Sequence, residues 1–164
     1  MYFCLMMAKH MNDIDKNLYF MHEAMKCASN SLFENEVPVG AVIVKNNLIV
    51  GRGWNRVLQE NRVTSHAEIN AIIDASKNLK NYRLLNCNLF VTLEPCHMCA
   101  KAIVNARINN VFFATSEPKA GAIISADNFF EKSFLNHKVN YSEGLMKEES
   151  SELLRNFFKK RRTL

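Results

Sequence analysis

Asn88-Leu89-Phe90-Val91-Thr92-Leu93-Glu94-Pro95-Cys96-His97-Met98-Cys99 joins an apolar, strand-like run directly to the start of a helix. Residues 88–93 have the composition of a buried strand, and Pro95 suits the first turn of a helix. Cysteines three positions apart on a helix share one face, so Cys96 and Cys99 can point at the same ion. The positive end of the helix dipole favours their thiolate forms, which are the forms that bind metal.

A second polar group lies earlier in the chain, in His66-Ala67-Glu68. Together the two segments supply one imidazole, two thiolates and one further carboxylate. A catalytic zinc ion typically has three protein ligands and a water molecule in the fourth position. The sequence therefore predicts His66, Cys96 and Cys99 as zinc ligands, which leaves Glu68 to carry protons. Because residues two apart diverge in mid-helix, this prediction requires His66 and Glu68 to lie in a first helical turn.

A Cys-x-x-Cys pair by itself is also typical of a redox pair or of half of a structural zinc site. A structural site needs a fourth protein ligand, for which the spare side chains are Cys87, His97, His10 and His22. Cys87 begins an apolar run, where cysteine is more often a small core residue, and His97 points away from the ligand face. In contrast, H-x-E followed by P-C-x-x-C is the signature of zinc-dependent deaminases. The combined pattern favours a catalytic metal.

The rest of the chain predicts an α/β fold in one domain. Helical periodicity and β-branched runs alternate along it, and Asn46-Asn47 separates two such runs in a way that suits a tight hairpin turn. The strand and helix alternation favours parallel pairing within a mixed sheet between helices, with both metal-binding segments at one end. Helices are predicted at 14–28, 67–79, 96–106 and from 144 onward, and strands at 39–45, 48–54, 88–93 and 110–114.

Composition is consistent with one intracellular domain of 164 residues. The formal net charge of +5 would help to attract a polyanion, although such an excess is also common on soluble proteins. Five cysteines at irregular positions predict no disulfide framework and favour the reducing cytoplasm. Residues 1–12 lack the features of a signal peptide or membrane anchor, so we expect a disordered extension before a domain at 13–164.

Further motifs extend the pattern beyond the predicted metal site. They are Glu36-Val37-Pro38-Val39-Gly40-Ala41-Val42, Gly53-Trp54-Asn55-Arg56, Asn81-Tyr82-Arg83-Leu84 and Lys119-Ala120-Gly121-Ala122. With the two metal segments they resemble the bacterial tRNA adenosine deaminases of the cytidine/deoxycytidylate deaminase superfamily, over residues 13–162. The resemblance implies a cytidine-deaminase-like three-layer α/β/α fold with a mixed five-stranded sheet. It also implies one zinc ion per subunit, a homodimer, and hydrolytic conversion of the wobble adenosine of a tRNA anticodon to inosine.

Carried over by position, the resemblance makes Glu68 the proton shuttle for zinc-activated water and Asn55 a polar contact to the flipped nucleoside. It places Lys119, Phe158 and Arg162 against the tRNA anticodon stem-loop. An aromatic side chain beside cations, as at Phe158, suits stacking on an unpaired base. Basic residues at a helix C-terminus are, however, also favoured by the helix dipole whatever the partner.

The chain departs from the family at Glu117, where aspartate is common, and at Ile123-Ile124, where small residues are common. These departures fall on the expected RNA side and leave the metal chemistry intact, so they bear on substrate selectivity. One alternative is the same zinc chemistry on a free base or nucleoside such as guanine, cytosine or cytidine, which the basic C-terminal helix disfavours. Another is a non-catalytic zinc-stabilised RNA-binding subunit, in which Glu68 would be dispensable.

Overall fold

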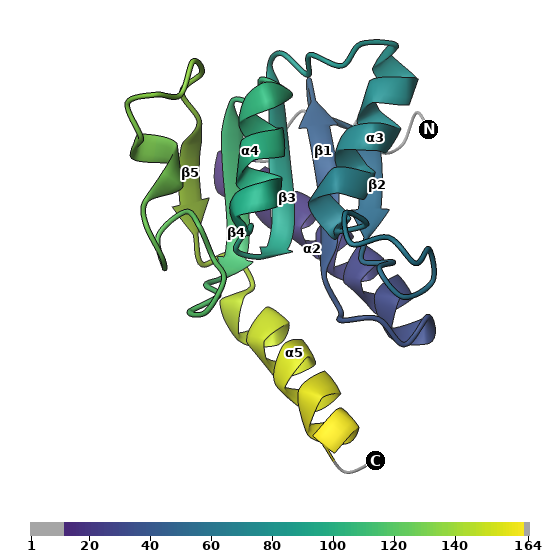
Figure 1. Cartoon of the computed structure of the whole chain (residues 1–164). Helices are drawn as coiled ribbons and strands as arrows, with labels where there is room; N and C mark the ends of the chain where they lie inside the picture. The colour runs from purple at the N-terminus through teal and green to yellow at the C-terminus, as the bar shows by residue number, and fades with distance from the viewer. Residues whose placement is uncertain (1–11, 163–164) are drawn as a thin grey trace.

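A five-stranded sheet with helices on both faces makes up the computed structural model, which describes residues 12–162 (Figure 1). Apart from Asn12, the predicted N-terminal extension lies outside the described residues. The elements in chain order are α2 (Asp13–Phe33), β1 (Gly40–Lys45), β2 (Leu48–Trp54), α3 (Ala67–Leu79), β3 (Cys87–Leu93), α4 (His97–Asn105), β4 (Asn110–Thr115), the 3-10 turn η1 (Phe129–Glu131), β5 (Asn140–Glu143) and α5 (Lys147–Arg162).

The sheet is mixed, with the strand order β2-β1-β3-β4-β5. Strand β1 pairs antiparallel with β2 and β3, whereas β4 pairs parallel with β3 and β5. This topology confirms the predicted α/β class with a mixed five-stranded sheet. The residue pattern located four of these strands but not β5, because Asn140–Glu143 is short and mostly polar and exposed.

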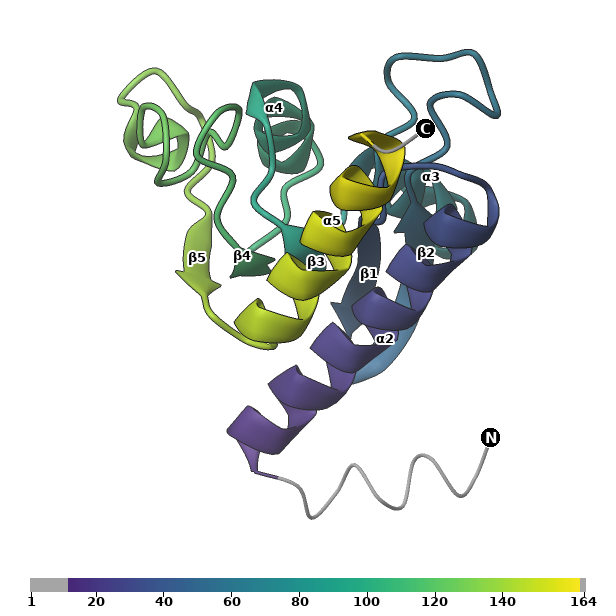
Figure 2. The same ribbon diagram turned by 90° about the horizontal axis from the view of Figure 1, so that it is seen from below.

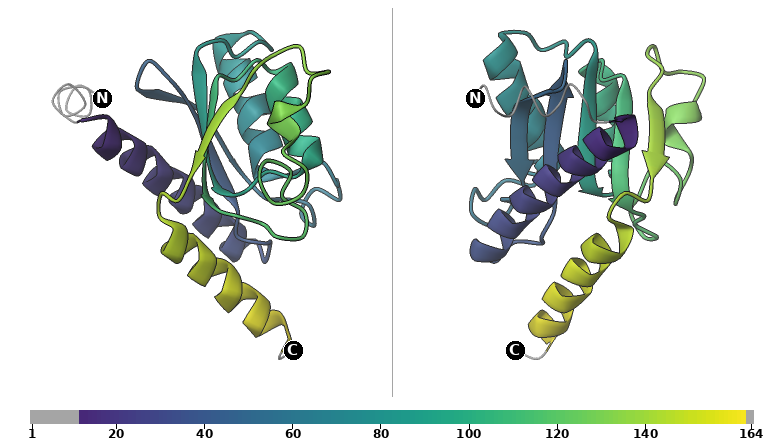
Figure 3. Two further views of the ribbon diagram at one scale, coloured as in Figure 1. Left: turned by 90° about the vertical axis from the view of Figure 1, so that its left-hand side faces the viewer. Right: turned by 180° about the vertical axis from the view of Figure 1, so that it is seen from behind.

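The two faces of the sheet carry different helices. Ala41 and Ile43 of β1 face the core shared with α3 and α4, whereas the alternate residues Val42 and Val44 face α2. Figures 2 and 3 show α2 and α5 on one side of the sheet and α3 and α4 on the other. Because strand residues alternate between faces and all four of these are buried, β1 forms the centre of a three-layer structure.

The β1–β2 connection has the predicted hairpin geometry. Asn46 and Asn47 both have positive φ, 51° and 61°, as a two-residue type I′ turn requires. Asparagine tolerates this conformation better than other non-glycine residues, which explains the Asn-Asn pair. The turn lets β2 return beside β1 and end next to the start of α3.

Two glycines of β2 let α3 pack unusually close to the sheet. A Cβ atom at Gly53 would lie 2.2 Å from the Ala67 carbonyl oxygen and 2.3 Å from the Ala71 amide nitrogen. At Gly51 it would lie 2.5 Å from the Ala71 carbonyl oxygen. These backbone atoms cannot move without displacing the helix, so the two glycines set how closely α3 packs on β2.

We therefore expect Gly53→Ala to lower the free energy of unfolding by about 1–3 kcal/mol, the usual cost of overpacking a tight core. Urea unfolding followed by circular dichroism would measure the change. Ser142→Ala, at an exposed position on β5, is the control and should stay within about 0.5 kcal/mol of the unsubstituted protein. Equal stability of the two variants would mean that α3 can shift away from β2 at little cost.

Helix α5 is joined to the sheet mainly near its N-terminal end. The Ser150 hydroxyl donates to the Thr92 carbonyl at 2.5 Å, and the Ser151 hydroxyl donates to the Thr115 hydroxyl at 2.9 Å. Towards its C-terminus, the Arg161 guanidinium donates to the Asn35 carbonyl at 3.3 Å. These contacts bring the basic end of α5 to the end of the molecule where α2 finishes (Figure 2).

Candidate active site

Helices α3 and α4 begin at the same edge of the sheet, because each follows a strand that ends there. His66 is the N-cap of α3 and Cys96 is the N-cap of α4, both with extended backbone. Cys99 and Glu68 lie in the first turns of the two helices. The condition that His66 and Glu68 occupy a first helical turn is thus met, and free backbone N–H groups from two helix ends converge on this edge.

The three expected ligands lie together. The His66 Nδ1 atom is 3.8 Å from Cys96 Sγ and 3.5 Å from Cys99 Sγ, and all three ligand atoms lie within 4.8 Å of one another. A tetrahedral zinc ion with Zn–S of about 2.3 Å and Zn–N of about 2.0 Å places neighbouring N and S atoms about 3.5 Å apart. The cluster therefore has the spacing of a single zinc site.

Among residues 12–162, these three side chains form the one group of histidine, cysteine or acidic residues that could hold a metal ion. No fourth side chain from this part of the chain belongs to the group. Cys87, the spare cysteine, is buried at the start of β3, and the His97 side chain faces Asp127, with Nε2 3.2 Å from a carboxylate oxygen. Three protein ligands leave one position of a tetrahedral ion for solvent. That arrangement fits a catalytic site better than a structural one.

The two cysteines differ in protonation because they lie in contact. A hydrogen bond from the Cys99 thiol, together with a smaller contribution from His66, lowers the pKa of Cys96 to about 4. Donation to Cys96 and burial together raise the pKa of Cys99 above its ordinary value. The hydrogen bond with Cys96 likewise raises the pKa of His66. These contacts thus favour the thiolate form of Cys96, which is the form that binds metal.

Glu68 is a buried carboxyl group next to the three expected ligands, and its role as the proton shuttle remains a prediction. Glu68 is only 4 % exposed, and this burial raises the pKa of its carboxyl group to about 7. A carboxyl group with a pKa near the working pH can both accept and donate a proton, which general acid–base catalysis requires. Glu68 is also one of the residues that line the pocket described next.

A pocket of about 350 Å³ opens onto the metal cluster, the group formed by His66, Cys96 and Cys99. Its volume lies in the range of small-molecule sites, and apolar side chains with a few polar groups form its walls. The lining residues are Glu36, Val37, Val39, Asn55, Val57, Leu58, His66, Glu68, Leu93, Glu94, Cys96, Glu117, Ala120 and Arg161. A planar base of nucleoside size is compatible with such a cavity.

Asn55 has a structural contact as well as a place in this pocket. Its Oδ1 atom accepts a hydrogen bond from the Ala67 amide at 2.9 Å, at the first turn of α3. The backbone N–H of Asn55 donates to the Val39 carbonyl at 3.1 Å. Asn55 therefore holds the backbone beside His66 in place, and the nucleoside contact expected for it remains a prediction.

The predicted RNA-contacting residues lie outside the lining of this pocket. Lys119, Phe158 and Arg162 are all exposed, with Phe158 at 46 %. Arg161 lines the pocket instead, and its guanidinium lies 5.3 Å from the centre of the Phe157 ring. In a run of four basic residues, only the phase of α5 and its docking decide which one faces the pocket. That is why sequence reasoning missed Arg161.

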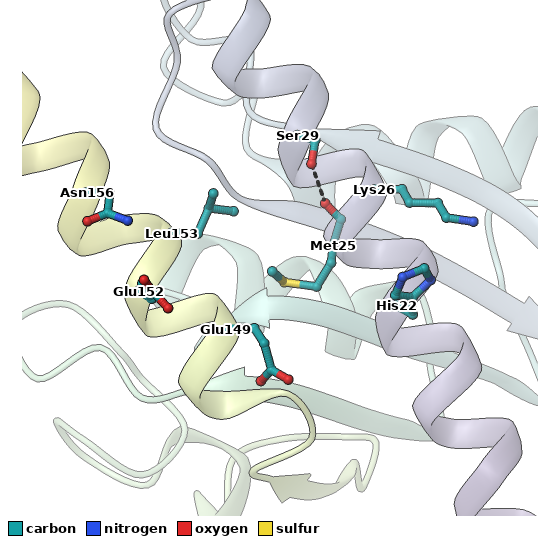
Figure 4. Close-up of a pocket in the computed structure, with 8 residues that line it drawn as sticks. All are labelled: His22, Met25, Lys26, Ser29, Glu149, Glu152, Leu153 and Asn156. Atoms are coloured by element: carbon teal, nitrogen blue, oxygen red, sulfur yellow. Dashed lines mark hydrogen bonds between the residues drawn. The ribbon is translucent and has the colours of Figure 1, made fainter.

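A second hollow of about 340 Å³ lies between α2 and α5 (Figure 4). It shares no residue with the pocket at the metal cluster. Its lining residues are His22, Met25, Lys26, Ser29, Glu149, Glu152, Leu153 and Asn156. The dashed bond in Figure 4 joins the Ser29 hydroxyl to the Met25 carbonyl at 3.2 Å, a contact within α2.

Comparison with known proteins agrees with this geometry. Residues 14–115 match the family model described as the cytidine and deoxycytidylate deaminase zinc-binding region. The chain is 43% identical to the tRNA-specific adenosine deaminase of Haemophilus influenzae over 156 residues, which cover 94% of this chain and 89% of that protein. It belongs to the tRNA-specific adenosine deaminase family. A second member, from Buchnera aphidicola subsp. Schizaphis graminum, is 40% identical over 90% of this chain and 97% of that protein.

Solved structures give the same fold. One from a study of A-to-I editing by tRNA:A34 deaminases at the wobble position is 40% identical, with a TM-score of 0.81 over 83% of this chain and 99% of that chain. The guanine deaminase of Nitrosomonas europaea is 20% identical, with a TM-score of 0.75 over 90% of this chain and 98% of that chain. At this low identity, the guanine deaminase is evidence for a shared fold and for nothing about the substrate.

Membership of this family confirms the predicted zinc-dependent hydrolase, with one zinc ion per subunit as the cofactor. It also confirms the cytidine-deaminase-like architecture expected from the sequence. Across residues 12–162, no helix combines the length and apolar character that crossing a bilayer requires.

Proposed function

We propose that this protein deaminates the wobble adenosine of a tRNA anticodon to inosine, with His66, Cys96 and Cys99 as the zinc ligands. The observation that carries the proposal is the buried carboxylate of Glu68 beside a three-ligand metal cluster, at a pocket of nucleoside size. The tRNA-specific adenosine deaminases that are 40–43% identical to this chain support adenosine in tRNA as the substrate.

The reaction replaces the amino group on C6 of adenine with oxygen from water and releases ammonia. Zinc, when bound, supplies the activation of water at neutral pH. Glu68 accepts the two protons of the attacking water one after the other, and it passes the first to the ring nitrogen and the second to the leaving amine. The apolar walls formed by Val39, Val57 and Leu93 exclude bulk water from the base, which keeps the carboxyl group of Glu68 in a nonpolar environment.

Substrate contacts are proposed at two levels. Asn55 lines the pocket and would hold the flipped nucleoside beside the metal. Lys119, Phe158 and Arg162 lie on the exposed surface and would contact the anticodon stem-loop outside the pocket. Exposed cations attract phosphates and an exposed phenyl ring can stack on an unpaired base, so this arrangement suits a single-stranded loop.

The proposal is tested by incubating the zinc-loaded protein with an anticodon stem-loop RNA that carries adenosine at the wobble position. Free adenosine, guanine and cytidine are incubated separately. We expect inosine and ammonia from the RNA alone, with a KM that rises with salt because phosphate contacts contribute to binding. Turnover of a free base in place of the RNA would retain the zinc chemistry and refute the tRNA substrate.

The protein is further proposed to act as a homodimer in the cytoplasm. The chain has a mass of 18.8 kDa, so light scattering at working concentration should give about twice that value. Thiolate ligands are consistent with a reducing compartment. A monomeric mass together with full activity would refute the dimer.

A further inference from the structure

Glu94, the residue before the Pro95-Cys96 segment, is buried with 3 % of its surface exposed, although it is not a member of the metal cluster. Both of its carboxylate oxygens are occupied by one loop. Its Oε1 atom accepts hydrogen bonds from three successive backbone amides, those of Ile123, Ile124 and Ser125, at 3.0, 2.8 and 3.0 Å. A buried carboxylate that accepts this many hydrogen bonds holds the backbone of its partner segment in one conformation.

The other oxygen binds the opposite end of the same loop. Glu94 Oε2 accepts the Glu117 amide at 2.9 Å and also the Ser125 hydroxyl. One carboxylate therefore joins the beginning and the end of the loop at residues 116–125. This loop contains no helix or strand, so these bonds replace the ones that regular structure would provide.

The same loop is attached to the segment that carries Cys96. The Ala122 amide donates to the Pro95 carbonyl at 2.9 Å, and Gly121 forms an isolated antiparallel bridge with Cys96. A Cβ atom at Gly121 would lie 2.3 Å from the Glu94 carboxylate, so only glycine allows the loop to close this tightly. The loop and the metal-binding segment are thus packed as one unit with Glu94 at its centre.

Two residues of this loop, Glu117 and Ala120, line the pocket at the metal cluster, and Lys119 between them is exposed. We propose that Glu94 is a positioning residue that fixes this loop as the pocket wall and RNA-facing surface. The part of this proposal that concerns RNA rests on the proposed function. The mechanical part, in which Glu94 holds the loop, does not depend on any substrate.

The test variant is Glu94→Gln, which keeps the size of the side chain. Either orientation of the amide places an NH₂ group against backbone N–H donors, so either the bond from the Glu117 amide or the three bonds from the amides of residues 123–125 are lost. We expect amide hydrogen exchange at residues 117 and 122–125 to accelerate by about 10- to 100-fold, as the loss of bonds to a charged acceptor implies. Exchange in α3 and α4 should be unchanged, and zinc content should remain near one ion per chain.

Glu36→Gln is the matched control. Glu36 is equally buried, and its carboxylate also accepts two backbone amides, from Leu58 at 2.6 Å and Gln59 at 3.0 Å. Glu36 and Leu58 line the same pocket, but they belong to segments of the chain separate from the loop at residues 116–125. The control variant should accelerate exchange at residues 58–59 and leave residues 117–125 protected, which separates loop anchoring from a general loosening of the fold.

Kinetics on the anticodon stem-loop RNA give the second readout. For Glu94→Gln, we expect KM to rise about tenfold or more while kcat changes by less than about threefold, because the loop contacts RNA and Glu68 stays in place. Unchanged exchange at 117–125 would overturn the anchoring role, and faster exchange with an unchanged KM would overturn the role in substrate binding. If the protein does not deaminate this RNA at all, the proposed function fails. The exchange experiment still tests whether Glu94 holds the loop, because it needs no substrate.

Ser125→Ala serves as a milder second variant if Glu94→Gln does not fold. It removes only the hydroxyl donor to Glu94 and leaves the carboxylate and the backbone amides in place. Exchange at residues 117–125 should then accelerate by about threefold to tenfold. Full protection of the loop in this variant would also count against the proposal.

Discussion

Replacing Glu68 with Gln is expected to lower the rate of deamination by about 10²- to 10⁴-fold, the usual contribution of a general acid–base group. The amide has the same size as the carboxyl group but cannot take a proton from water or pass one to the base. Because Glu68 is not a ligand of the metal cluster, zinc content should stay near one ion per chain. Ammonia release at saturating RNA, together with metal analysis, would measure both quantities.

Stability gives a further check on this variant. The pKa of Glu68 is raised by burial to about 7, so the buried carboxyl group gains little from being charged. A neutral amide in its place should leave the melting temperature unchanged or slightly higher. Glu131→Gln, at an exposed position in η1, is the control and should retain full activity. A Glu68→Gln protein that still released ammonia at close to the original rate would show that another group carries the proton.

Replacing Cys99 with Ser is expected to abolish stoichiometric zinc binding. A serine hydroxyl keeps its proton at neutral pH and is a poor ligand for zinc, so only two of the three protein ligands remain. A ligand that binds only the folded state stabilises it by RT ln(1 + [L]/Kd), which is about 4 kcal/mol at a free concentration of about 1000 times Kd. The variant should lose that stabilisation along with all measurable activity.

A second buried cysteine provides the control. Cys87→Ser also places a hydroxyl in the core, at the start of β3, but leaves the metal cluster complete. A chelator should lower the melting temperature of the Cys87→Ser protein as it does for the unsubstituted protein, whereas Cys99→Ser should be insensitive to the chelator. One zinc ion per chain in the Cys99→Ser protein would contradict the ligand assignment.

Much of the fold was predictable because its determinants are local. The strand predicted at 48–54 and the helix predicted at 67–79 coincide with β2 and α3. Asn46-Asn47 marked the hairpin through backbone conformations that asparagine tolerates. In contrast, β5 has no such signal, since it is short and is recognised only through its parallel pairing with β4.

The chemistry expected at the site follows from residue types that are visible in the amino-acid sequence. Cys96 and Cys99 have the spacing of neighbours on one helix face, and the spacing of His66 and Glu68 requires a first helical turn. Ligand chemistry itself depends on residue type. The residues that surround the site, in contrast, come together only when the elements pack. Glu94 binds a loop more than twenty residues away, and the docking of α5 turns Arg161 into the pocket. Such contacts depend on how separate elements pack, which no local pattern encodes.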